Sequence, residues 1–302
     1  MPNSPAISAV ICTYNRGDRV VVAIQSILRN THPDFELILV DQSENHDTEQ
    51  AITAFLLDPR FHYIPSATHG LGASRNIGLE HARAEIVAFT DDDCSVPPNW
   101  LSVIERIFAQ HLRVSVIFSS VKAGPHDQIS GFIPTYTCRK NKIVRNICDK
   151  CLARGIGASM AVRHDPITRM GGFDEMLGAG SFFHSCEDAD IAIRAIVTGQ
   201  WVYETNDVVV THYGFRSWYE GRALAQRDWT GIGAAYIKPL RAGYMSTLLL
   251  IFYELLGPCM LDPLKPILKL RRPRGFGRMI AFLRGIVGGM RQPMDRKNLT
   301  YR

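Results

Sequence analysis

The stretch Ile86–Cys94 reads IVAFTDDDC and joins five residues suited to a buried strand to three consecutive aspartates. Carboxylates this close repel one another unless a positive charge lies among them. Mg²⁺ and Mn²⁺ prefer oxygen ligands and are usually held by one or two carboxylates together with substrate phosphates. A solvated acidic turn is the alternative for an isolated triplet, but α/β sheets bind their ligands where the strands end. The stretch therefore predicts a divalent metal site at the carboxyl end of a central strand.

Short apolar runs alternate with amphipathic helical segments through the first 120 residues. The runs are almost continuously apolar, which is typical of parallel strands covered by helices on both faces. This pattern predicts βαβ units with right-handed crossovers, and hence an α/β fold with a mostly parallel sheet. Strands are expected at Ala6–Thr13, Phe35–Asp41, Phe61–Pro65, Ile86–Thr90 and Val114–Val121, and helices at Asp18–Asn30, Asp47–Leu57, Leu71–Ala82 and Asn99–His111.

The second half of the chain has a weaker pattern. Residues 124–155 are polar and rich in Lys and Arg, which predicts a long loop or flap. Beyond Phe215 the chain reads as helical. The remaining expected elements are strands at Ile156–Val162, Trp201–Thr205 and Val208–Tyr213, and helices at Asp188–Thr198, Ser217–Tyr236 and Met245–Leu261.

The basic residues are concentrated at the C-terminus. Lys265–Arg302 carries eleven Lys and Arg against one acid, a net charge of +10, whereas the whole chain carries +5, so residues 1–264 carry −5. A basic tail on an acidic body favours an anionic partner, either a membrane surface or nucleic acid. Lys265–Arg291 interleaves Arg with apolar residues, as helices lying in a membrane interface do. A helical lid with a solvated basic face is the alternative.

Met245–Leu261 is apolar but contains Glu254, Gly257 and Pro258, and it falls short of the ~20 residues of a membrane span. The apolar run Ala6–Cys12 is too short for a signal peptide and reads as a strand. A reducing, cytoplasmic location is therefore expected.

Seven cysteines are present, an odd number. Cys138, Cys148 and Cys151 have a spacing that could hold zinc, with Cys186 or His184 as a fourth ligand. Free thiols are the alternative interpretation.

Polar residues follow each of the first four expected strands. A hydroxyl, an aromatic ring and a guanidinium after the first strand can stack on a base and neutralise phosphate, and a carboxylate and an amide after the second can accept from a base or ribose. A Gly-rich loop entering a helix and the three aspartates come next. Successive parallel strands end at one edge, so these side chains should converge there. They are Thr13, Tyr14, Arg16, Asp41, Gln42, Arg75, Asp91, Asp92 and Asp93.

Two further motifs lie in the second half. Glu187 and Asp188 stand at the start of an expected helix, where acidic residues also serve as first-turn charges that complement the helix dipole. His212 follows an expected strand, where it could bind a metal or simply lie at the surface.

In this order, the motifs resemble those of inverting family-2 glycosyltransferases with the GT-A fold. The resemblance covers roughly residues 6–215 and implies a Rossmann-like, mostly parallel sheet flanked by helices, with a C-terminal helical extension. The matching motifs are the Thr13-Tyr14-Asn15-Arg16 strand end, the Phe35–Gln42 strand, the Gly72-x-x-Arg75-Asn76-x-Gly78 helix entry, Asp91–Asp93, the Gly171-Gly172-Phe173-Asp174-Glu175 turn and the Glu187-Asp188 pair.

The resemblance implies transfer of a sugar, with inversion, from a UDP- or dTDP-type donor to a hydroxyl of a glycan or lipid-linked acceptor in polysaccharide or glycoconjugate synthesis. Mg²⁺ or Mn²⁺ would be held by Asp91, Asp93 and His212, and Asp92 would face the ribose. Asp188, beside Glu187, would deprotonate the acceptor.

The sequence departs from the family pattern in two places. Gln42 stands where many relatives have a second aspartate, although its amide oxygen can still accept from the N3–H of uracil or thymine. Three adjacent aspartates also leave the register of the family's Asp-x-Asp motif open, and we assign the metal to the first and third.

These expectations divide the chain into a nucleotide-sugar-binding half (1–120), an acceptor and catalytic-base half of the same domain (121–215), and a basic amphipathic helical extension (216–302). The expected location is cytoplasmic, peripheral at the inner face of the cell membrane, with an anionic membrane surface as partner and no nucleic acid. A nucleotidyltransferase or a non-catalytic nucleotide-sugar-binding protein is the alternative function. Nucleic-acid binding by the tail would leave the aspartates unexplained.

Overall fold

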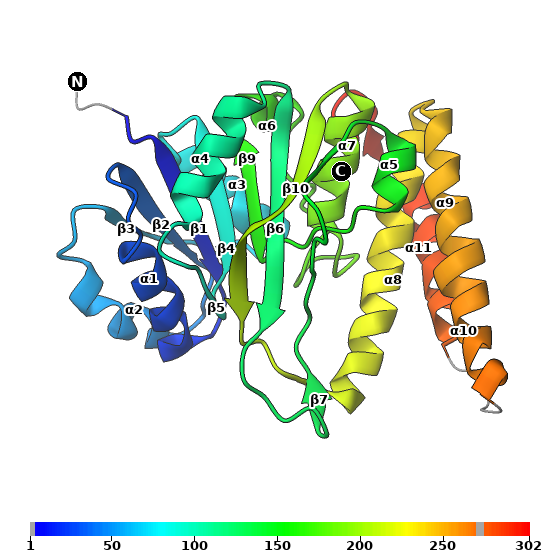
Figure 1. Ribbon diagram of the computed structural model, residues 1–302, viewed down its shortest axis with the longest axis horizontal. Coiled ribbons are helices and arrows are strands. Elements are labelled where there is room, and N and C mark those ends of the chain that lie inside the picture. The colour runs from blue at the N-terminus through cyan, green and yellow to red at the C-terminus, as the bar shows by residue number, and fades with distance from the viewer. Residues whose placement is uncertain (1–3, 270–274) are drawn as a thin grey trace.

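The computed structural model describes residues 4–269 and 275–302. Strands and helices alternate through the first 123 residues, as the apolar runs predicted (Figure 1). The elements of this half are β1 (Ile7–Thr13), η1 (Gly17–Arg19), α1 (Val20–Leu28), β2 (Phe35–Asp41), α2 (Asp47–Ala51), η2 (Thr53–Phe55), β3 (Phe61–Pro65), α3 (Leu71–His81), β4 (Ile86–Asp91), β5 (Cys94–Ser95), α4 (Trp100–Gln110) and β6 (Val114–Ala123).

The second half adds three strands to the main sheet, two short β-pairs and a group of helices. Its elements are β7 (Gly131–Phe132), β8 (Lys142–Val144), α5 (Ile147–Cys151), β9 (Ser159–Arg163), α6 (His164–Arg169), α7 (Glu187–Val197), β10 (Trp201–His212), β11 (Arg216–Ser217), α8 (Trp218–Arg241), η3 (Met245–Thr247), α9 (Leu248–Glu254), η4 (Leu255–Leu261), α10 (Asp262–Leu264), η5 (Lys265–Lys269), α11 (Gly277–Arg291), β12 (Met294–Asp295) and β13 (Thr300–Tyr301).

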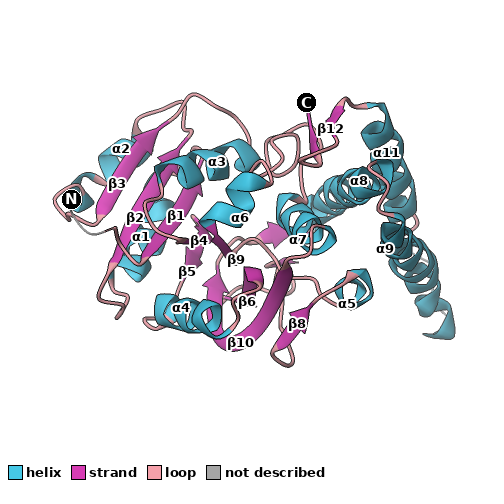
Figure 2. Ribbon diagram, turned by 90° about the horizontal axis from the view of Figure 1, so that it is seen from above, coloured by secondary structure: helices cyan, strands magenta, loops and turns pink. Residues whose placement is uncertain are grey.

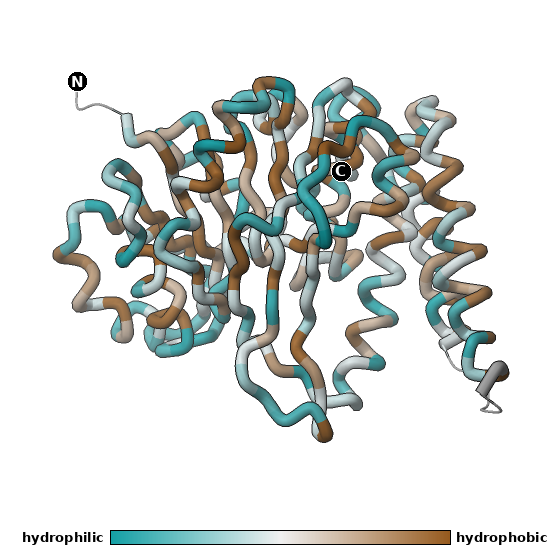
Figure 3. The backbone as a smooth tube through the Cα atoms, in the orientation of Figure 1, coloured by the Kyte–Doolittle hydropathy of each residue, from teal (hydrophilic) through white to brown (hydrophobic). Residues whose placement is uncertain are grey.

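The main sheet runs in the order β3-β2-β1-β4-β9-β6-β10-β5, with β8 also paired to β10. β1 pairs in parallel with β2 and β4, β2 with β3, and β6 with β10, whereas β9 lies antiparallel between β4 and β6. The predicted α/β fold with a mostly parallel sheet is therefore confirmed. Helices cover both faces (Figure 2), which explains why β1, β2 and β4 are almost entirely buried and mostly apolar. Hydrophobic stretches run through the sheet in Figure 3.

Register brings the strand ends to one edge of the sheet. Thr13 of β1 lies opposite Asp41 of β2, and Cys12 opposite Asp91 of β4. The loops that follow these strands therefore meet at the lower side of the molecule as drawn in Figure 1.

Two local predictions are wrong. The expected flap, residues 124–155, contains β7, β8 and α5, because it pairs with β10 and β11 rather than remaining a loop. The two expected strands at 201–205 and 208–213 are one strand, β10, with a register shift between Thr205 and Val209. The Asn141 amide oxygen accepts from the Thr205 hydroxyl and the Asn206 N–H, and so satisfies polar groups at the irregularity.

The C-terminal helices form a layer beside the sheet, with α8 innermost and α9 and α11 outside it (Figure 2). α8 and α11 approach so closely that a Cβ on Gly233 would meet the Phe282 carbonyl oxygen, and one on Gly285 the Thr230 carbonyl oxygen. One hydrophobic core runs from Val10 of β1 to Tyr301 of β13, so this layer shares a core with the sheet.

The apolar segment after α8 is longer than the sequence predicted. Helical turns continue from Met245 to Ile267, 23 residues, and the most apolar 18-residue stretch has a mean hydropathy of 1.4 and is 33% buried against the protein. By length and composition alone this segment could cross a membrane. Residues 270–274 of the expected basic segment Lys265–Arg291 lie outside the described residues, and the structure describes the rest of that segment.

Candidate active site

A cleft of about 810 Å³ opens at the edge where β1, β2 and β4 end. Its walls come from the strand ends on one side and from the loop before α7, the start of α7 and the start of α8 on the other. Among the predicted site residues, the cleft is lined by Thr13, Tyr14, Arg16, Gln42, Arg75, Asp91, Asp92, Asp93, Glu187, Asp188 and His212.

The three aspartates have different surroundings. The Thr13 hydroxyl donates to Asp92 Oδ2 at 2.8 Å, and Arg16 lies 3.4 Å from the same oxygen and 3.5 Å from Asp93 Oδ2. Burial raises the pKa of Asp92 to about 7, although Arg16 opposes the shift. Burial likewise raises the pKa of Asp91. The triplet therefore resists holding three negative charges without a further cation.

His212, at the end of β10, faces Asp93. Its Nδ1 contacts the Pro134 carbonyl oxygen at 2.9 Å, and its Nε2 lies 3.1 Å from Asp93 Oδ1. Burial acts against ionisation of both side chains, but their contact raises the pKa of His212 and holds that of Asp93 below its ordinary value. In the neutral imidazole, a carbonyl partner on Nδ1 favours the tautomer with its proton on Nδ1, whose Nε2 can bind a metal in place of its contact with Asp93.

Asp91, Asp93, Cys94 and His212 each offer a ligand atom within 4.8 Å of the others. Burial raises the pKa of the Cys94 thiol far above its ordinary value, so this sulfur stays protonated. The remaining donors are two carboxylates and one imidazole, a set that suits Mg²⁺ or Mn²⁺. The residues present therefore fit a divalent metal.

Arg75 connects the aspartates to the start of α7. It is 2% exposed, its Nη1 donates to Glu187 Oε1 at 2.7 Å, and its Nη2 lies 3.5 Å from Asp91 Oδ1. Its guanidinium also lies over the rings of Phe89 and Phe173. Despite burial, the neighbouring carboxylates raise the pKa of Arg75, so it remains charged.

Glu187 and Asp188 are adjacent but not equivalent. Glu187 is 6% exposed and is paired with Arg75, and burial raises its pKa to about 7. Asp188 is less buried, and its two oxygens accept backbone N–H groups of Gly157, at 2.7 Å, and Ala189, at 2.6 Å. Such bonds fix the carboxylate while leaving lone pairs that face the cleft.

The side chains at the ends of β1 and β2 differ in whether they can reach a ligand in the cleft. Tyr14 is exposed and donates to Glu44, whereas Asp41 is buried, accepts from Tyr63 and Ser43, and does not line the cleft. Gln42 donates through Nε2 to Thr68 and to the Gly70 carbonyl. No donor within the described residues reaches its amide oxygen, which is free to accept.

The sequence did not indicate the wall formed by α8 and β11. Leu224 and Asp228 of α8 and Arg216 of β11 line the cleft opposite the aspartates. Burial raises the pKa of Asp228, and a hydrogen bond with Ser185 opposes the shift. Asp228 lies among Arg227, Trp229 and other mixed residues, so no motif marked it.

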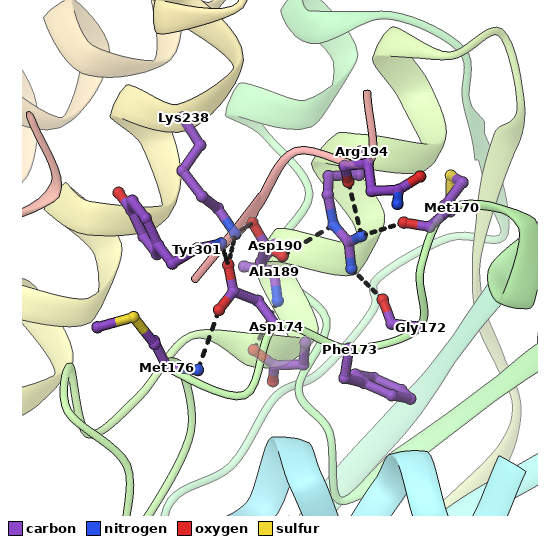
Figure 4. A network of polar contacts seen from close by, with 12 residues as sticks. Met170, Gly172, Phe173, Asp174, Met176, Ala189, Asp190, Arg194, Lys238 and Tyr301 are labelled. Carbon is purple, nitrogen blue, oxygen red and sulfur yellow. Dashed lines mark hydrogen bonds and ion pairs between the residues drawn. The ribbon is translucent and has the colours of Figure 1, made fainter. Parts of the chain in front are cut away.

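Behind the start of α7 lies a buried network of charges, drawn in Figure 4. Lys238 of α8 contacts Asp174 and lies 2.7 Å from Asp190 Oδ1, while Arg194 donates to Asp190 Oδ2 at 2.9 Å. The Tyr301 N–H donates to Asp174 at 2.8 Å. The network thus ties α7 to α8 and to the last strand of the protein.

The three cysteines of the predicted zinc site do not line the cleft. Cys138 donates to the Lys140 carbonyl and Cys151 to the Ile147 carbonyl, and Cys148 is exposed. Within residues 4–269 and 275–302 the group around His212 is the one set of potential metal ligands, and it includes none of these three. The described structure thus favours free thiols over zinc.

Comparison with known proteins gives a family and a fold. The family model described as "Glycosyl transferase family 2" matches residues 8–163. The succinoglycan biosynthesis protein ExoO of Rhizobium meliloti is 33% identical over 114 residues, 37% of this chain and 32% of that protein. The matched segments span between 13% and 38% of the length of such curated relatives.

Two solved structures are similar throughout the fold. Mannosyltransferase PcManGT from Pyrobaculum calidifontis, in complex with GDP-Man and Mn²⁺, has a TM-score of 0.65 and 17% identity over 96% of this chain and 88% of that one. S. aureus TarS 1–349, in complex with UDP-GlcNAc, has a TM-score of 0.60 and 17% identity over 76% of this chain and 65% of that one. These likenesses show the GT-A fold.

Proposed function

The chain belongs to glycosyl transferase family 2, and on that premise we propose that it transfers a sugar from a nucleotide diphosphate sugar to an acceptor hydroxyl with inversion. The observation that carries the proposal is the composition of one cleft. Two carboxylates and an imidazole gather at the strand ends, and a separate carboxylate, Asp188, stands on the wall formed by α7. One group of ligands and one base are what a single metal-assisted displacement requires.

Asp91, Asp93 and His212 would hold Mg²⁺ or Mn²⁺. When bound, the metal would neutralise charge on the donor's diphosphate, including the charge that develops as the glycosidic bond breaks. Arg75 would add a fixed positive charge beside the same phosphates, because it already lies against Asp91. A solved relative's complex with GDP-Man and Mn²⁺ supports this assignment by analogy of fold.

The nucleotide would lie across the ends of β1 and β2. Tyr14 would stack against the base, Gln42 would accept from a base N–H, and Arg16 would face the phosphates beside Asp92 and Thr13. A free amide oxygen on Gln42 suits the N3–H of a uracil or thymine base. UDP- or dTDP-sugars are thus the proposed donors. Asp41, which the sequence also assigned here, would act indirectly, because its oxygens accept from Tyr63 and Ser43.

Asp188 would take the proton of the acceptor hydroxyl as that oxygen attacks the anomeric carbon. Two backbone N–H groups orient its carboxylate. Glu187 would instead position Arg75, since its carboxylate already accepts a hydrogen bond from the Arg75 guanidinium. One attack and one departure at opposite faces of the sugar give inversion.

The acceptor would enter between α7 and α8, where Leu224 and Asp228 line the cleft. Residues 1–120 would then serve the donor, residues 121–215 the acceptor and the base, and the helices from residue 216 the acceptor side and a membrane. A glycan or lipid-linked acceptor in polysaccharide synthesis, used at the inner face of the cell membrane, fits this arrangement, and the name of the ExoO relative supports it.

Thermal unfolding with nucleotide diphosphates tests the proposal. Ligands that bind the native state raise its stability by mass action, about 2.7 kcal/mol at a hundredfold excess over Kd. UDP or dTDP should raise the melting temperature only together with Mn²⁺ or Mg²⁺, and more than GDP does. A shift that is equal with EDTA would contradict the metal assignment, and the absence of a shift with every nucleotide would contradict the donor class.

A further inference from the structure

Two exposed apolar tips lie on the side of the molecule where the cleft opens. The first tip comprises Ile129, Trp218 and Tyr219, at the loop before β7 and the start of α8. Ile129 is 89% exposed and Tyr219 84% exposed. The Trp218 Nε1–H donates to the Ile129 carbonyl at 3.0 Å, and its ring stacks on Phe132, so the tip is held in shape. Hydrophobic residues reach this tip in Figure 3.

The second tip lies at the lower end of the outer helices. Leu261, Leu264 and Ile267 are exposed there, and Phe276 and Ile280 are exposed at the start of α11. The pattern continues along α11 with the exposed residues Leu283, Val287 and Met290. These positions recur every three or four residues and form one apolar stripe facing away from the stripe that packs on α8.

The strand ends that line the cleft lie on the same side of the molecule as both tips. In Figure 1 the strand ends of β1 and β4, the β7 loop, the start of α8 and α10 all point downward. Arg216 and Leu224, which line the cleft, lie on either side of Trp218 and Tyr219 in the chain. A flat surface that touched both tips would therefore face the entrance of the cleft.

The charges near the second tip select the kind of surface. Lys265, Arg278 and Arg284 are exposed, and no ion pair among the described residues involves either arginine. The acid beside them, Asp262, is already paired with Lys265. Basic residues beside apolar ones match an anionic lipid headgroup layer above an acyl region.

The acids near the first tip are held locally. Glu220 closes a capping box with Ser217, and Asp127 accepts from Ser130. Trp and Tyr suit a membrane interface, because each has an apolar ring and a polar group. The first tip is therefore suited to insertion and the second to insertion with electrostatic attraction.

We infer that the protein docks on an anionic phospholipid surface through both tips, so that its cleft faces the bilayer and receives an acceptor carried by a lipid. The helical segment from Met245 stands beside α8 and reaches this surface with its lower end, at α10, without crossing it (Figure 1). Leu250, Ile251 and Cys259 on its inner side are buried, and Glu254 is paired with Arg154 at 2.7 Å. The acceptor class rests on the proposed function, whereas the docking itself does not.

Sedimentation with vesicles tests the docking. The full chain should bind vesicles of phosphatidylcholine and phosphatidylglycerol, bind phosphatidylcholine alone much less, and be released by high salt. Binding that resists alkaline carbonate would show a membrane-spanning segment and overturn the inference. A lack of binding to both vesicles would overturn it too, even if the nucleotide still raises the melting temperature.

Variants test each tip separately. Ile129→Glu with Tyr219→Glu, and Leu264→Glu with Ile280→Glu, should each weaken binding by about tenfold or more, because apolar burial is lost and a negative charge is added. Leu57→Glu, at a residue that is also 89% exposed but lies after α2 at the far end of the sheet, should leave binding unchanged. All should unfold at the same urea concentration.

Dependence on the second tip alone would overturn the two-tip orientation. A change from dimer to monomer in Leu264→Glu with Ile280→Glu, without vesicle binding by the parent chain, would assign the stripe to contact between copies.

Tryptophan fluorescence supplies an independent readout of orientation. Of the four tryptophans, Trp218 is exposed, whereas Trp100 and Trp229 are buried and Trp201 is half-buried. Lipids brominated on their acyl chains should quench Trp218, and Trp218→Phe should remove that quenching while binding persists. Vesicle binding without quenching of Trp218 would place the first tip away from the bilayer and refute the proposed orientation.

Discussion

The molecule contains two clusters of carboxylates close to each other, and they are built differently. Behind α7, Asp174 and Asp190 are matched by Lys238 and Arg194, all four buried. In the cleft, six acids share three arginines and one histidine: the acids are the Asp91–Asp93 triplet, the Glu187-Asp188 pair and Asp228, and the arginines are Arg16, Arg75 and Arg216. The first cluster is neutral from its own residues, whereas the second carries an excess of negative charge at an open surface.

The difference shows what separates a structural acid from a functional one. A buried carboxylate whose countercharge comes from the same chain fixes the positions of helices. A cluster with too few countercharges keeps an excess of negative charge and is complete only with a cation from solution. Four predictions, taken in order of expected size, test this distinction.

The largest effect is expected from Lys238→Met. The substitution keeps an unbranched side chain but leaves Asp174 and Asp190 without the cation between them. Removing one partner of a buried ion pair is worth about 3–5 kcal/mol of unfolding free energy. Urea denaturation measures the loss.

Lys122→Met is the control, because Lys122 is exposed at the end of β6 and makes no ion pair among the described residues. Adding Asp174→Asn to Lys238→Met should recover part of the loss, since it restores neutrality. A loss no larger than in the control would mean that the network does not stabilise the fold.

The next effect concerns the base. Asp188→Asn should reduce sugar transfer by about 10²-fold or more, equal to about 2.7 kcal/mol of transition-state stabilisation, while donor binding stays nearly intact. Transfer is measured as release of the nucleotide diphosphate under saturating donor.

Asp165→Asn, in the first turn of α6, controls for loss of a charge at a helix start. If Asp188→Asn kept full transfer but lost well over 1 kcal/mol of stability, its role would be that of a first-turn charge. Full transfer with no loss of stability would move the base elsewhere.

A smaller effect is expected from Asp93→Asn. The wild type should gain up to about 2.7 kcal/mol of stability at a hundredfold excess of Mn²⁺ over Kd, and the variant should lose most of this gain. The two melting temperatures without metal should be closer than those with it. Glu80→Gln, at an exposed position of α3, is the control. An equal response to Mn²⁺ in both would remove Asp93 from the metal site.

The contrast also explains which features the sequence could predict. Continuous apolar strands and the residues just after them follow local patterns, so β1 to β4 and the cleft side that they form were predicted nearly to the residue. The direction of β9 depends on its neighbours, and composition does not encode it. β10 looked like two strands because Asn206 and Asp207 resemble a turn, whereas Asn141, 65 residues away, bonds to this stretch.

Ion pairs between residues far apart in the chain could not be predicted from the sequence either. Lys238 and Asp174 are 64 residues apart, and Lys238 lies in a helix whose sequence carries no motif. Asp228 was not predicted as a cleft residue for the same reason, because no motif in α8 marks it. The sequence could mark acidic residues, but only the structure showed which of them have a cation beside them.

The smallest effect concerns the pH dependence of Glu187. Its pKa of about 7 in the native state lies above the value of 4.5 for an unperturbed glutamate, because burial outweighs the pairing with Arg75. Between these values the native state holds more protons than the unfolded chain, so this group makes stability fall as pH rises through that window. Glu187→Gln does not titrate and should lose this dependence, although it also weakens the contact with Arg75. The stability of the variant relative to wild type, measured by urea denaturation with EDTA present, should therefore improve by on the order of 1 kcal/mol between about pH 5 and about pH 8. A constant difference across this range would mean that Arg75 holds Glu187 ionised in the native state, and the two clusters would then differ only at the metal.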